Sequence, residues 1–143
     1  MLDLLEVNTS KNENVPLSTA LGRVLAKDII AALNDPEFPT ASMDGYAVIH
    51  ADLDTESIRI LGDNPAGNNE IRIVTSGTCI KTFTGSKMPQ GSDTLIQIEN
   101  VNAYEGKISI EEKVPFGSSV RPIGEGYKAG DILIKKGTKI GFA

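Results

Sequence analysis

Pairs of isoleucines separated by a single residue recur along this chain, and they constrain its fold more than any other feature. A spacing of two places both side chains on the same face of a β-strand. Isoleucine is β-branched and suits a pleated, half-buried surface. The five pairs are Ile58/Ile60, Ile71/Ile73, Ile96/Ile98, Ile108/Ile110 and Ile132/Ile134. We therefore expect five strand segments.

Clusters of turn-forming residues lie between these segments, at positions 62–69, 89–93, 104–106 and 130–131. They are rich in Gly, Asn, Asp and Pro, which each favour tight turns for a different steric or hydrogen-bonding reason. Short strands with frequent turns are typical of an antiparallel barrel or sandwich. The pattern predicts a mainly β fold.

Helix is scarce in this sequence. The best candidate is Ser18–Gly22, where a hydroxyl residue can cap the start and Gly22 can end the helix in the left-handed conformation. The following branched residues from Val24 to Ile30 predict a strand. Pro36 and Pro39 then mark a crossover, because proline cannot donate to a strand ladder.

A second boundary is expected near residues 115–119, after which glycine-punctuated strands resume. We therefore predict two parts. Residues 36–115 form an inserted, barrel-like β domain, and residues 1–35 and 116–143 form an extended, mostly β first domain with a short helix. The chain ends directly after a strand, without a closing helix or polar tail, and we interpret this as the end of a fragment.

The composition narrows the classes of function. A chain of 143 residues with 40% hydrophobic side chains can bury a full core. A net charge of -5 disfavours nucleic acid and membrane partners, because an acidic surface repels phosphates and anionic lipid. The acidic start lacks the features of a signal peptide, and no apolar run is long enough for a membrane span, so we expect a cytoplasmic protein.

The chain has one cysteine, Cys79, and one histidine, His50. A single cysteine cannot form an internal disulfide, and the two residues do not make a His/Cys cluster for zinc or iron. Cys79 lies in an alternating apolar stretch, which indicates a buried small side chain rather than a nucleophile.

Three segments carry candidate chemistry. In SMDGYAV, Asp44 lies between Met43 and Tyr46. One interpretation is that Asp44 closes a turn into a strand. The other is that its neighbours limit solvent and raise the pKa of its carboxyl, which suits proton transfer or the holding of a magnesium-bound substrate. In FTGSKMP, Gly85 lets backbone amides approach an anion, beside the Thr84 hydroxyl and the Lys87 charge.

The third segment is RPIGEGYKAGD. Arginine suits bidentate phosphate recognition, and a glutamate between two glycines lies on backbone that can adopt unusual dihedral angles. The alternative is a surface ion pair between Arg121 and Glu125, worth under about 1 kcal/mol.

Taken together, five motifs resemble one known family. In order they are PLSTALGRVLAKDI, SMDGYAV, FTGSKMP, RPIGEGYKAGD and GTKIG, and they span residues 16–141. Their order and intervals are similar to the N-terminal region of the molybdopterin molybdenumtransferases, the family of bacterial MoeA and the gephyrin E domain. The resemblance implies an extended first domain interrupted by a barrel-like second domain.

The resemblance also implies an activity. The family inserts molybdenum from molybdate into molybdopterin after magnesium-dependent hydrolysis of adenylated molybdopterin. Its active cleft lies at a homodimer interface, where the second domain of one subunit faces the third domain of the other. We therefore expect adenylated molybdopterin and molybdate as substrates, Mg²⁺ as the metal cofactor, and a homodimer.

Carried over motif by motif, the resemblance implies the following site residues. The catalytic candidates are Asp44, Thr84 and Glu125, with Asp44 near the magnesium. The substrate-binding candidates are Ser42, Gly45, Tyr46, Gly85 and Arg121. No metal ligand is otherwise assigned.

Two departures from the family pattern matter. The family usually has aspartate directly after the glycine-glutamate pair, and here that place is Gly126. If the family's cleft requires that aspartate, this protein has lost its role or has moved the role to another residue. The family's third and fourth domains are also absent, so we expect this piece alone to be catalytically incomplete.

Two other functions remain open. The chain can be a non-catalytic dimerisation or scaffold module, since relatives of this family also bind other proteins. A small independent hydrolase that uses Asp44 with Glu125 is a weaker hypothesis, because paired carboxylates need a defined separation in a closed pocket.

Overall fold

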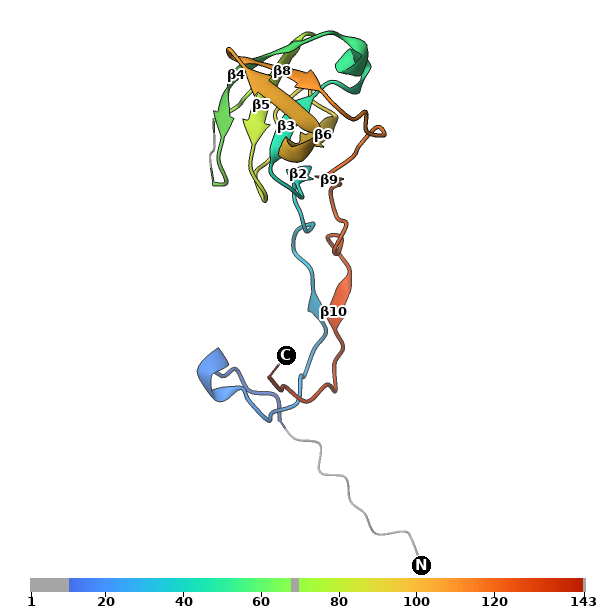
Figure 1. Ribbon diagram of the computed structural model, residues 1–143. Coiled ribbons are helices and arrows are strands. Elements are labelled where there is room, and N and C mark those ends of the chain that lie inside the picture. The colour runs from blue at the N-terminus through green and yellow to red at the C-terminus, as the bar shows by residue number, and fades with distance from the viewer. Residues whose placement is uncertain (1–10, 68–69, 143) are drawn as a thin grey trace, which may run out of the picture. The chain divides into compact units, whose positions relative to one another are not determined.

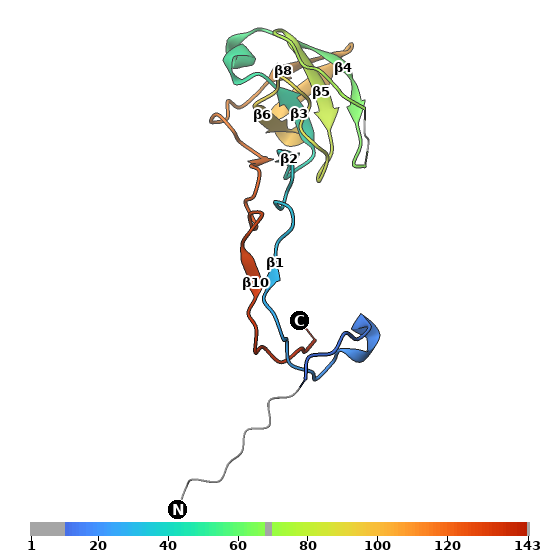
Figure 2. The same ribbon diagram turned by 180° about the vertical axis from the view of Figure 1, so that it is seen from behind.

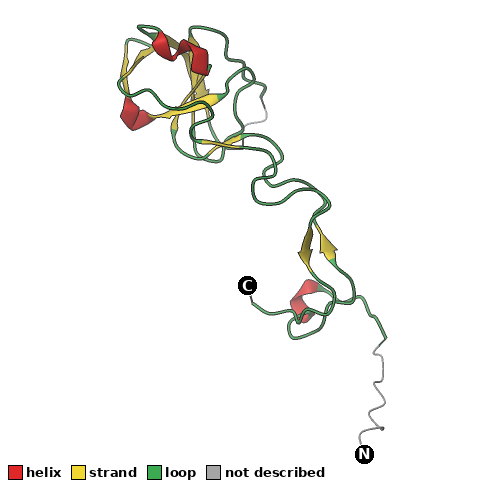
Figure 3. Cartoon of the chain, turned by 90° about the vertical axis from the view of Figure 1, so that its right-hand side faces the viewer, coloured by secondary structure: helices red, strands yellow, loops and turns green. Residues whose placement is uncertain are grey.

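The structure is a computed structural model that describes residues 11–67 and 70–142. Its elements are short and are almost all strands (Figure 3). In chain order they are η1 (Leu17–Thr19), β1 (Ile29–Ile30), β2 (Thr40–Ala41), β3 (Gly45–Val48), η2 (His50–Asp54), β4 (Ile58–Asn64), β5 (Thr78–Thr82), β6 (Thr94–Gln97), η3 (Ile98–Asn100), β7 (Val101–Tyr104), β8 (Lys107–Ile110), β9 (Val120–Arg121) and β10 (Ile132–Ile134). Residues 33–128 form one compact unit, and the described residues on either side form a second.

The unit of residues 33–128, called the central unit below, is built on one six-stranded sheet in the order β6-β3-β5-β4-β8-β7. The sheet curls round on itself (Figure 1). This confirms the prediction of a mainly β, barrel-like fold. The short ladder of β2 with β9 belongs to the same unit.

The pattern of short strands indicated an antiparallel barrel or sandwich, and one pair of strands departs from this. Strands β4 and β5 pair in parallel, whereas the other neighbours in the sheet are antiparallel. A parallel pair needs a crossover connection rather than a tight hairpin. The segment of residues 65–77 between the two strands provides that crossover.

The core of the central unit lies on both faces of β3, whose four residues are all buried. One cluster contains Tyr46, Val48, Leu53, Ile58, Cys79, Ile96 and Ile108. A second cluster on the other face contains Ala41, Ala47, Met88 and Leu95. Successive residues of a strand point to opposite faces, so β3 holds the two clusters together.

The isoleucine pattern predicted most of these strands. The pairs at residues 58/60, 108/110 and 132/134 lie in β4, β8 and β10. The pair Ile96/Ile98 is split between two elements, because Ile96 lies in β6 whereas Ile98 begins η3. The prediction of a strand at Ile71/Ile73 is wrong. Ile71 lies in no strand, and Ile73 forms only a single bridge with Gln90. Both side chains are exposed.

The second unit, called the terminal unit below, is held mainly by backbone hydrogen bonds between its two chain segments. Strands β1 and β10 pair antiparallel (Figure 2). Farther along, the amide of Gly22 donates to the carbonyl of Ile140 at 2.8 Å, and the amide of Leu25 donates to Thr138 at 2.9 Å. All five residues of β1 and β10 are exposed.

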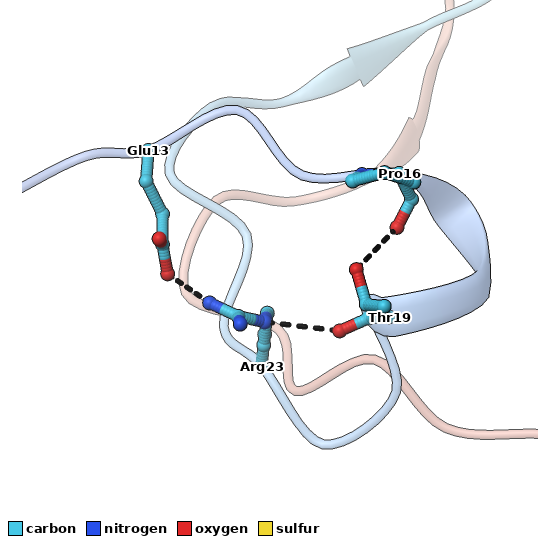
Figure 4. A network of polar contacts seen from close by, with 4 residues as sticks. All are labelled: Glu13, Pro16, Thr19 and Arg23. Carbon is cyan, nitrogen blue, oxygen red and sulfur yellow. Dashed lines mark hydrogen bonds and ion pairs between the residues drawn. The ribbon is translucent and has the colours of Figure 1, made fainter.

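The predicted helix of the terminal unit is a single 3-10 turn, η1, and Gly22 lies beyond it with a positive φ of 79°, as expected for a terminating glycine. Figure 4 shows the polar network that closes this turn. The Thr19 hydroxyl donates to Pro16 at 3.0 Å, and Arg23 Nε donates to the Thr19 carbonyl at 3.0 Å. Arg23 also pairs with Glu13.

Within the residues that the structure describes, we find no helix with the length and apolar character that crossing a membrane requires.

Candidate functional site

The candidate site is organised by residues 40–45, which connect β2 to β3 in the central unit. On one side, the amide of Gly85 donates to the Ala41 carbonyl at 2.8 Å, and the Ala41 amide donates to Ser86 at 2.9 Å. On the other side, β2 pairs with β9, with Thr40 opposite Arg121. The segments of all three candidate motifs therefore meet along these few residues.

Asp44 and Thr84 are brought into direct contact although they lie 40 residues apart. The Thr84 hydroxyl donates to Asp44 Oδ1 at 2.6 Å. The Thr84 amide donates to the same oxygen at 2.8 Å. Among the described residues, no donor is hydrogen-bonded to Asp44 Oδ2. One carboxylate oxygen is thus fixed, and the other accepts no hydrogen bond from the part of the chain that the structure describes.

The pKa of Asp44 is lowered from its ordinary value, first by the hydrogen bond from the Thr84 hydroxyl and then by the Thr84 amide, with a smaller contribution from the charge of Lys81. One of the two interpretations of the sequence was the opposite shift, caused by burial between Met43 and Tyr46. That interpretation is wrong because Asp44 is exposed, Met43 is itself exposed, and Tyr46 belongs to the core. The Asp44 carboxylate therefore stays ionised at neutral pH, which suits it to act as an oxygen ligand and not as an acid, and its lowered pKa makes it a weaker base.

Gly45 and Tyr46 lie inside the fold. A Cβ on Gly45 would lie 2.2 Å from the carbonyl oxygen of Ile96, so glycine is required for β3 to approach β6. Tyr46 is 6% exposed, and burial raises the pKa of its hydroxyl. These two residues support the site through packing.

The amides around Gly85 in the FTGSKMP loop are used within the chain. Thr84 donates to Asp44, Gly85 to Ala41, and Ser86 to the Phe83 carbonyl at 2.9 Å. Lys87 Nζ lies 3.7 Å from the centre of the Phe38 ring, a cation–π contact. The amides of Thr84, Gly85 and Ser86 are therefore not free to bind an anion, and Thr84 instead binds Asp44.

Arg121 and Glu125 form a partly exposed ion pair, in which Arg121 Nε donates to Glu125 Oε2 at 2.6 Å. The hydrogen bond to Glu125 raises the pKa of the arginine, and the charges of Glu125 and Asp35 act in the same direction. The structure thus contains the ion pair that the sequence left open as an alternative. Exposed pairs of this kind contribute little stability.

Two residues that the sequence reasoning missed support the Ser42–Asp44 turn. The Ser42 amide donates to the carbonyl of Ser119 at 3.0 Å. Gln97 Nε2 donates to the Ser119 hydroxyl at 3.3 Å. Ser119 has a φ of 54°, a conformation that is uncommon for serine and is often stabilised at functional sites. No sequence signal distinguished this serine from the boundary segment around it.

A groove of about 1370 Å³ borders the candidate site in the central unit. Its wall includes Phe38, Lys87, Met88, Phe116 and Ile123. Among the predicted site residues only Gly85 lines it. The groove and the Asp44–Thr84 pair are therefore neighbours that share the FTGSKMP loop.

Other candidates are structural. Cys79 is buried, and desolvation raises the pKa of its thiol to about 12, which confirms that it is an inert core side chain. His50 Nε2 lies 3.0 Å from the Val114 carbonyl and its ring contacts Phe116 edge-on. Over residues 11–67 and 70–142, no group of three or more His, Cys, Asp or Glu side chains is placed to hold a metal.

The whole chain, residues 1–143, matches the family model described as the MoeA N-terminal region, domains I and II. It is 34% identical to a molybdopterin molybdenumtransferase of Haemophilus influenzae, over 98% of this chain and 35% of that protein. It is 32% identical to gephyrin of Dictyostelium discoideum, over 92% of this chain and 20% of that protein.

A crystal structure of the molybdopterin biosynthesis protein MoeA from Pyrococcus horikoshii superposes with a TM-score of 0.83 at 35% identity, over 90% of this chain and 35% of that one. A second structure of a MoeA protein from the same organism gives 0.82 at 31% identity, over 90% of this chain and 34% of that one. The chain thus spans about a third of the length of these MoeA structures.

Proposed function

Because the chain belongs to the family of the MoeA N-terminal region, we propose that it is the N-terminal part of a molybdopterin molybdenumtransferase. In this proposal the whole protein inserts molybdenum from molybdate into adenylated molybdopterin. This chain contributes one wall of the active site, and a third domain from a second subunit completes it. Several relatives bear the name of this enzyme, which supports the reaction class.

The observation that carries the proposal is the contact between Asp44 and Thr84. Two motifs far apart in the sequence converge on a single exposed carboxylate, and one of its oxygens is left without a hydrogen-bond donor from the described residues. A fixed, ionised carboxylate can accept a proton from attacking water or orient a cation on a phosphate. A carboxylate that only closes a turn does not need two donors on the same oxygen.

The residues present fit magnesium as an ion that arrives with the substrate. Mg²⁺ is commonly held by one or two carboxylates together with substrate phosphates and water. Asp44 Oδ2 provides one such oxygen. When bound, Mg²⁺ would supply charge neutralisation to the phosphates of the adenylated substrate.

The remaining residues have supporting roles in this proposal. Thr84 orients Asp44 and keeps it ionised. Arg121 faces the substrate with the guanidinium N–H groups that Glu125 does not use, since a guanidinium has five donors. Glu125 holds Arg121 rather than acting on the substrate directly. Ser42 is half-buried, with its amide bound to Ser119, beside the Asp44 turn.

We also propose that the protein is a homodimer. Large apolar side chains of the terminal unit are exposed, among them Ile30, Ile132, Leu133 and Ile134. Contiguous exposed apolar surface is commonly covered by a partner. Sedimentation velocity at tens of micromolar should show a dimer, a concentration at which a standard interface is populated; a strict monomer would contradict this part of the proposal.

The test of the catalytic proposal uses a chimera in which this chain replaces the matching N-terminal third of the Haemophilus influenzae relative. The chimera should form molybdenum cofactor from adenylated molybdopterin, molybdate and Mg²⁺. Asp44→Asn should lower cofactor formation by at least about a hundredfold, the lower end for a positioned acid or base. The thermal unfolding midpoint should change little, since asparagine is an equally good turn residue.

Asp54→Asn is the matched control. Asp54 is also an exposed aspartate whose pKa is lowered, in this case by Lys113. It lies at the end of η2 and contacts none of the site residues described above. Normal activity of Asp44→Asn would refute the catalytic role and favour the non-catalytic scaffold function.

A further inference from the structure

The turn that carries Arg121 and Glu125 is attached to the segment Asp35–Pro36 by three backbone hydrogen bonds. The amide of Asp35 donates to the Tyr127 carbonyl at 2.9 Å. The amide of Gly126 donates to the Asp35 carbonyl at 2.8 Å, and that of Gly124 donates to Pro36 at 3.0 Å. This segment therefore fixes the backbone around the ion pair.

The Asp35 carboxylate lies against Gly126. A Cβ added to Gly126 would be 2.7 Å from Asp35 Oδ2, closer than Cβ contacts in folded proteins. The nearest backbone atom to that Cβ, the Asp35 carbonyl oxygen, is at 3.3 Å, which is tight but tolerable. Gly126 is also absent from the positive-φ residues, so its backbone conformation accepts a side chain. The main obstacle to a side chain at position 126 is therefore the Asp35 carboxylate, which would have to leave its present place.

The charge of Asp35 also acts on Arg121. The pKa of Arg121 is raised first by the hydrogen bond to Glu125, and the negative charge of Asp35 adds to this effect. Arg121 is thus paired directly with Glu125 and lies within the longer-range field of Asp35, whose backbone is bound to the same turn. The ion pair with Glu125 fixes one edge of the guanidinium, and a second negative charge nearby favours orientations in which the remaining donors turn toward it.

We propose that Asp35 is a positioning residue for Arg121, and that position 126 is glycine because it must admit the Asp35 carboxylate. The inference rests on the proposed function in so far as Arg121 faces the substrate. It also explains why Gly126 occupies the place where the resembled family usually has aspartate. The carboxylate expected after Glu125 is not lost, because residue 35 supplies one at that place from the opposite segment.

The first test measures Arg121 in the isolated chain. Exchange of the Arg121 Nε proton with water should be slow in the parent chain, since Glu125 accepts it. Asp35→Asn should accelerate this exchange severalfold, and Asp35→Glu should largely restore it. Glu111→Gln, at an exposed glutamate outside the turn, should have no effect. An unchanged Arg121 signal in Asp35→Asn would overturn the positioning role.

The second test exchanges the two residues. Gly126→Asp alone should destabilise the chain, whereas the double variant Asp35→Ala/Gly126→Asp should regain thermal stability because the obstructing carboxylate is gone. In the active chimera, Asp35→Ala and Gly126→Asp should each reduce kcat/KM. The kcat/KM of the double variant should be at least about fivefold higher than the value obtained by multiplying the two separate reductions. Such a coupling is within the range found for residues of one network.

Each remaining outcome has a defined meaning. A double variant that is no more stable than Gly126→Asp, or whose effects are simply multiplicative, overturns the inference. An unfolded Gly126→Asp with a folded double variant supports it. A wild-type chimera that makes no cofactor contradicts the proposed function alone, because the stability and exchange measurements still decide the role of Asp35.

Discussion

The two units of this chain are both made of short strands, but different forces hold them. In the central unit the strands of one sheet enclose two apolar clusters, and Ile58, Leu95, Ile96 and Ile108 are fully buried. In the terminal unit, backbone hydrogen bonds join two segments whose large apolar side chains stay exposed. Strand pairing therefore does not by itself create a core, and only the central unit has the packing for independent stability.

The largest loss of stability is expected from Gly45→Ala, in the packed central unit. The new Cβ would collide with the Ile96 carbonyl and force β3 away from β6. We expect the free energy of unfolding to fall by more than about 4 kcal/mol, in the exceptional class of single substitutions. Urea unfolding followed by circular dichroism measures it.

Gly141→Ala is the control for that experiment. A Cβ on Gly141, in the terminal unit, has no atom within 4 Å. We expect a change within about 0.5 kcal/mol, as for surface substitutions. Equal effects of the two alanines would contradict the picture of one packed and one unpacked unit.

A smaller effect is expected from removing one isoleucine side chain in each unit. Ile108 in β8 is 0% exposed, whereas Ile134 in β10 is 42% exposed. Ile108→Ala should cost about 2–5 kcal/mol through lost burial and a residual cavity. Ile134→Ala should cost under about 1 kcal/mol in the monomer, measured at protein concentrations too low for association. A large loss for Ile134→Ala at low concentration would show a core that the structure lacks.

The smallest effect on stability is expected at the exposed pair of the candidate site. Thr84→Val removes the hydroxyl donor and leaves the amide, so the pKa of Asp44 should rise toward its ordinary value of 3.8. A lowered carboxyl pKa contributes stability that is present at neutral pH and is lost as the pH falls through the folded-state pKa. The difference between the parent chain and Thr84→Val should therefore be largest near neutrality and vanish in acid.

Carbon-13 NMR titration of the Asp44 carboxyl measures the pKa directly. Thr138→Val, at an exposed threonine of the terminal unit, is the matched control and should leave that titration unchanged. An unshifted Asp44 titration in Thr84→Val would mean that the hydroxyl does not hold this carboxylate in solution.

The sequence predicted the strands where local pattern and burial agree. Ile58 and Ile108 alternate with exposed residues and lie opposite each other in the sheet. Ile71 and Ile73 have the same spacing, but they are not held between two neighbouring strands, and Ile73 forms only one bridge. Their side chains therefore remain exposed. Local alternation also says nothing about the direction of a neighbouring strand, so the parallel pairing of β4 with β5 was beyond its reach.

The candidate site was predictable only in part, for a similar reason. The motifs predicted Asp44 and Thr84 as site residues. The shift of the Asp44 pKa, however, depends on which donors reach one carboxylate oxygen. Those donors are set by the way the loop of residues 83–86 pairs with Ala41. Asp35 gave no signal at all. Its relation to Gly126 exists only because segments some ninety residues apart pair antiparallel.

That pairing of Asp35 with Tyr127 also has a consequence for the order of folding. Strands β1 and β10 are separated by about a hundred residues, and closing so long a loop for two exposed strands is entropically unfavourable. Local structure comes first: Glu105 and Gly106, both with positive φ, form a two-residue hairpin turn between β7 and β8. Once the central unit has folded and joined Asp35 to Tyr127, the remaining closure spans only a few residues on each side. We therefore expect the β1–β10 ladder to form last and to open first.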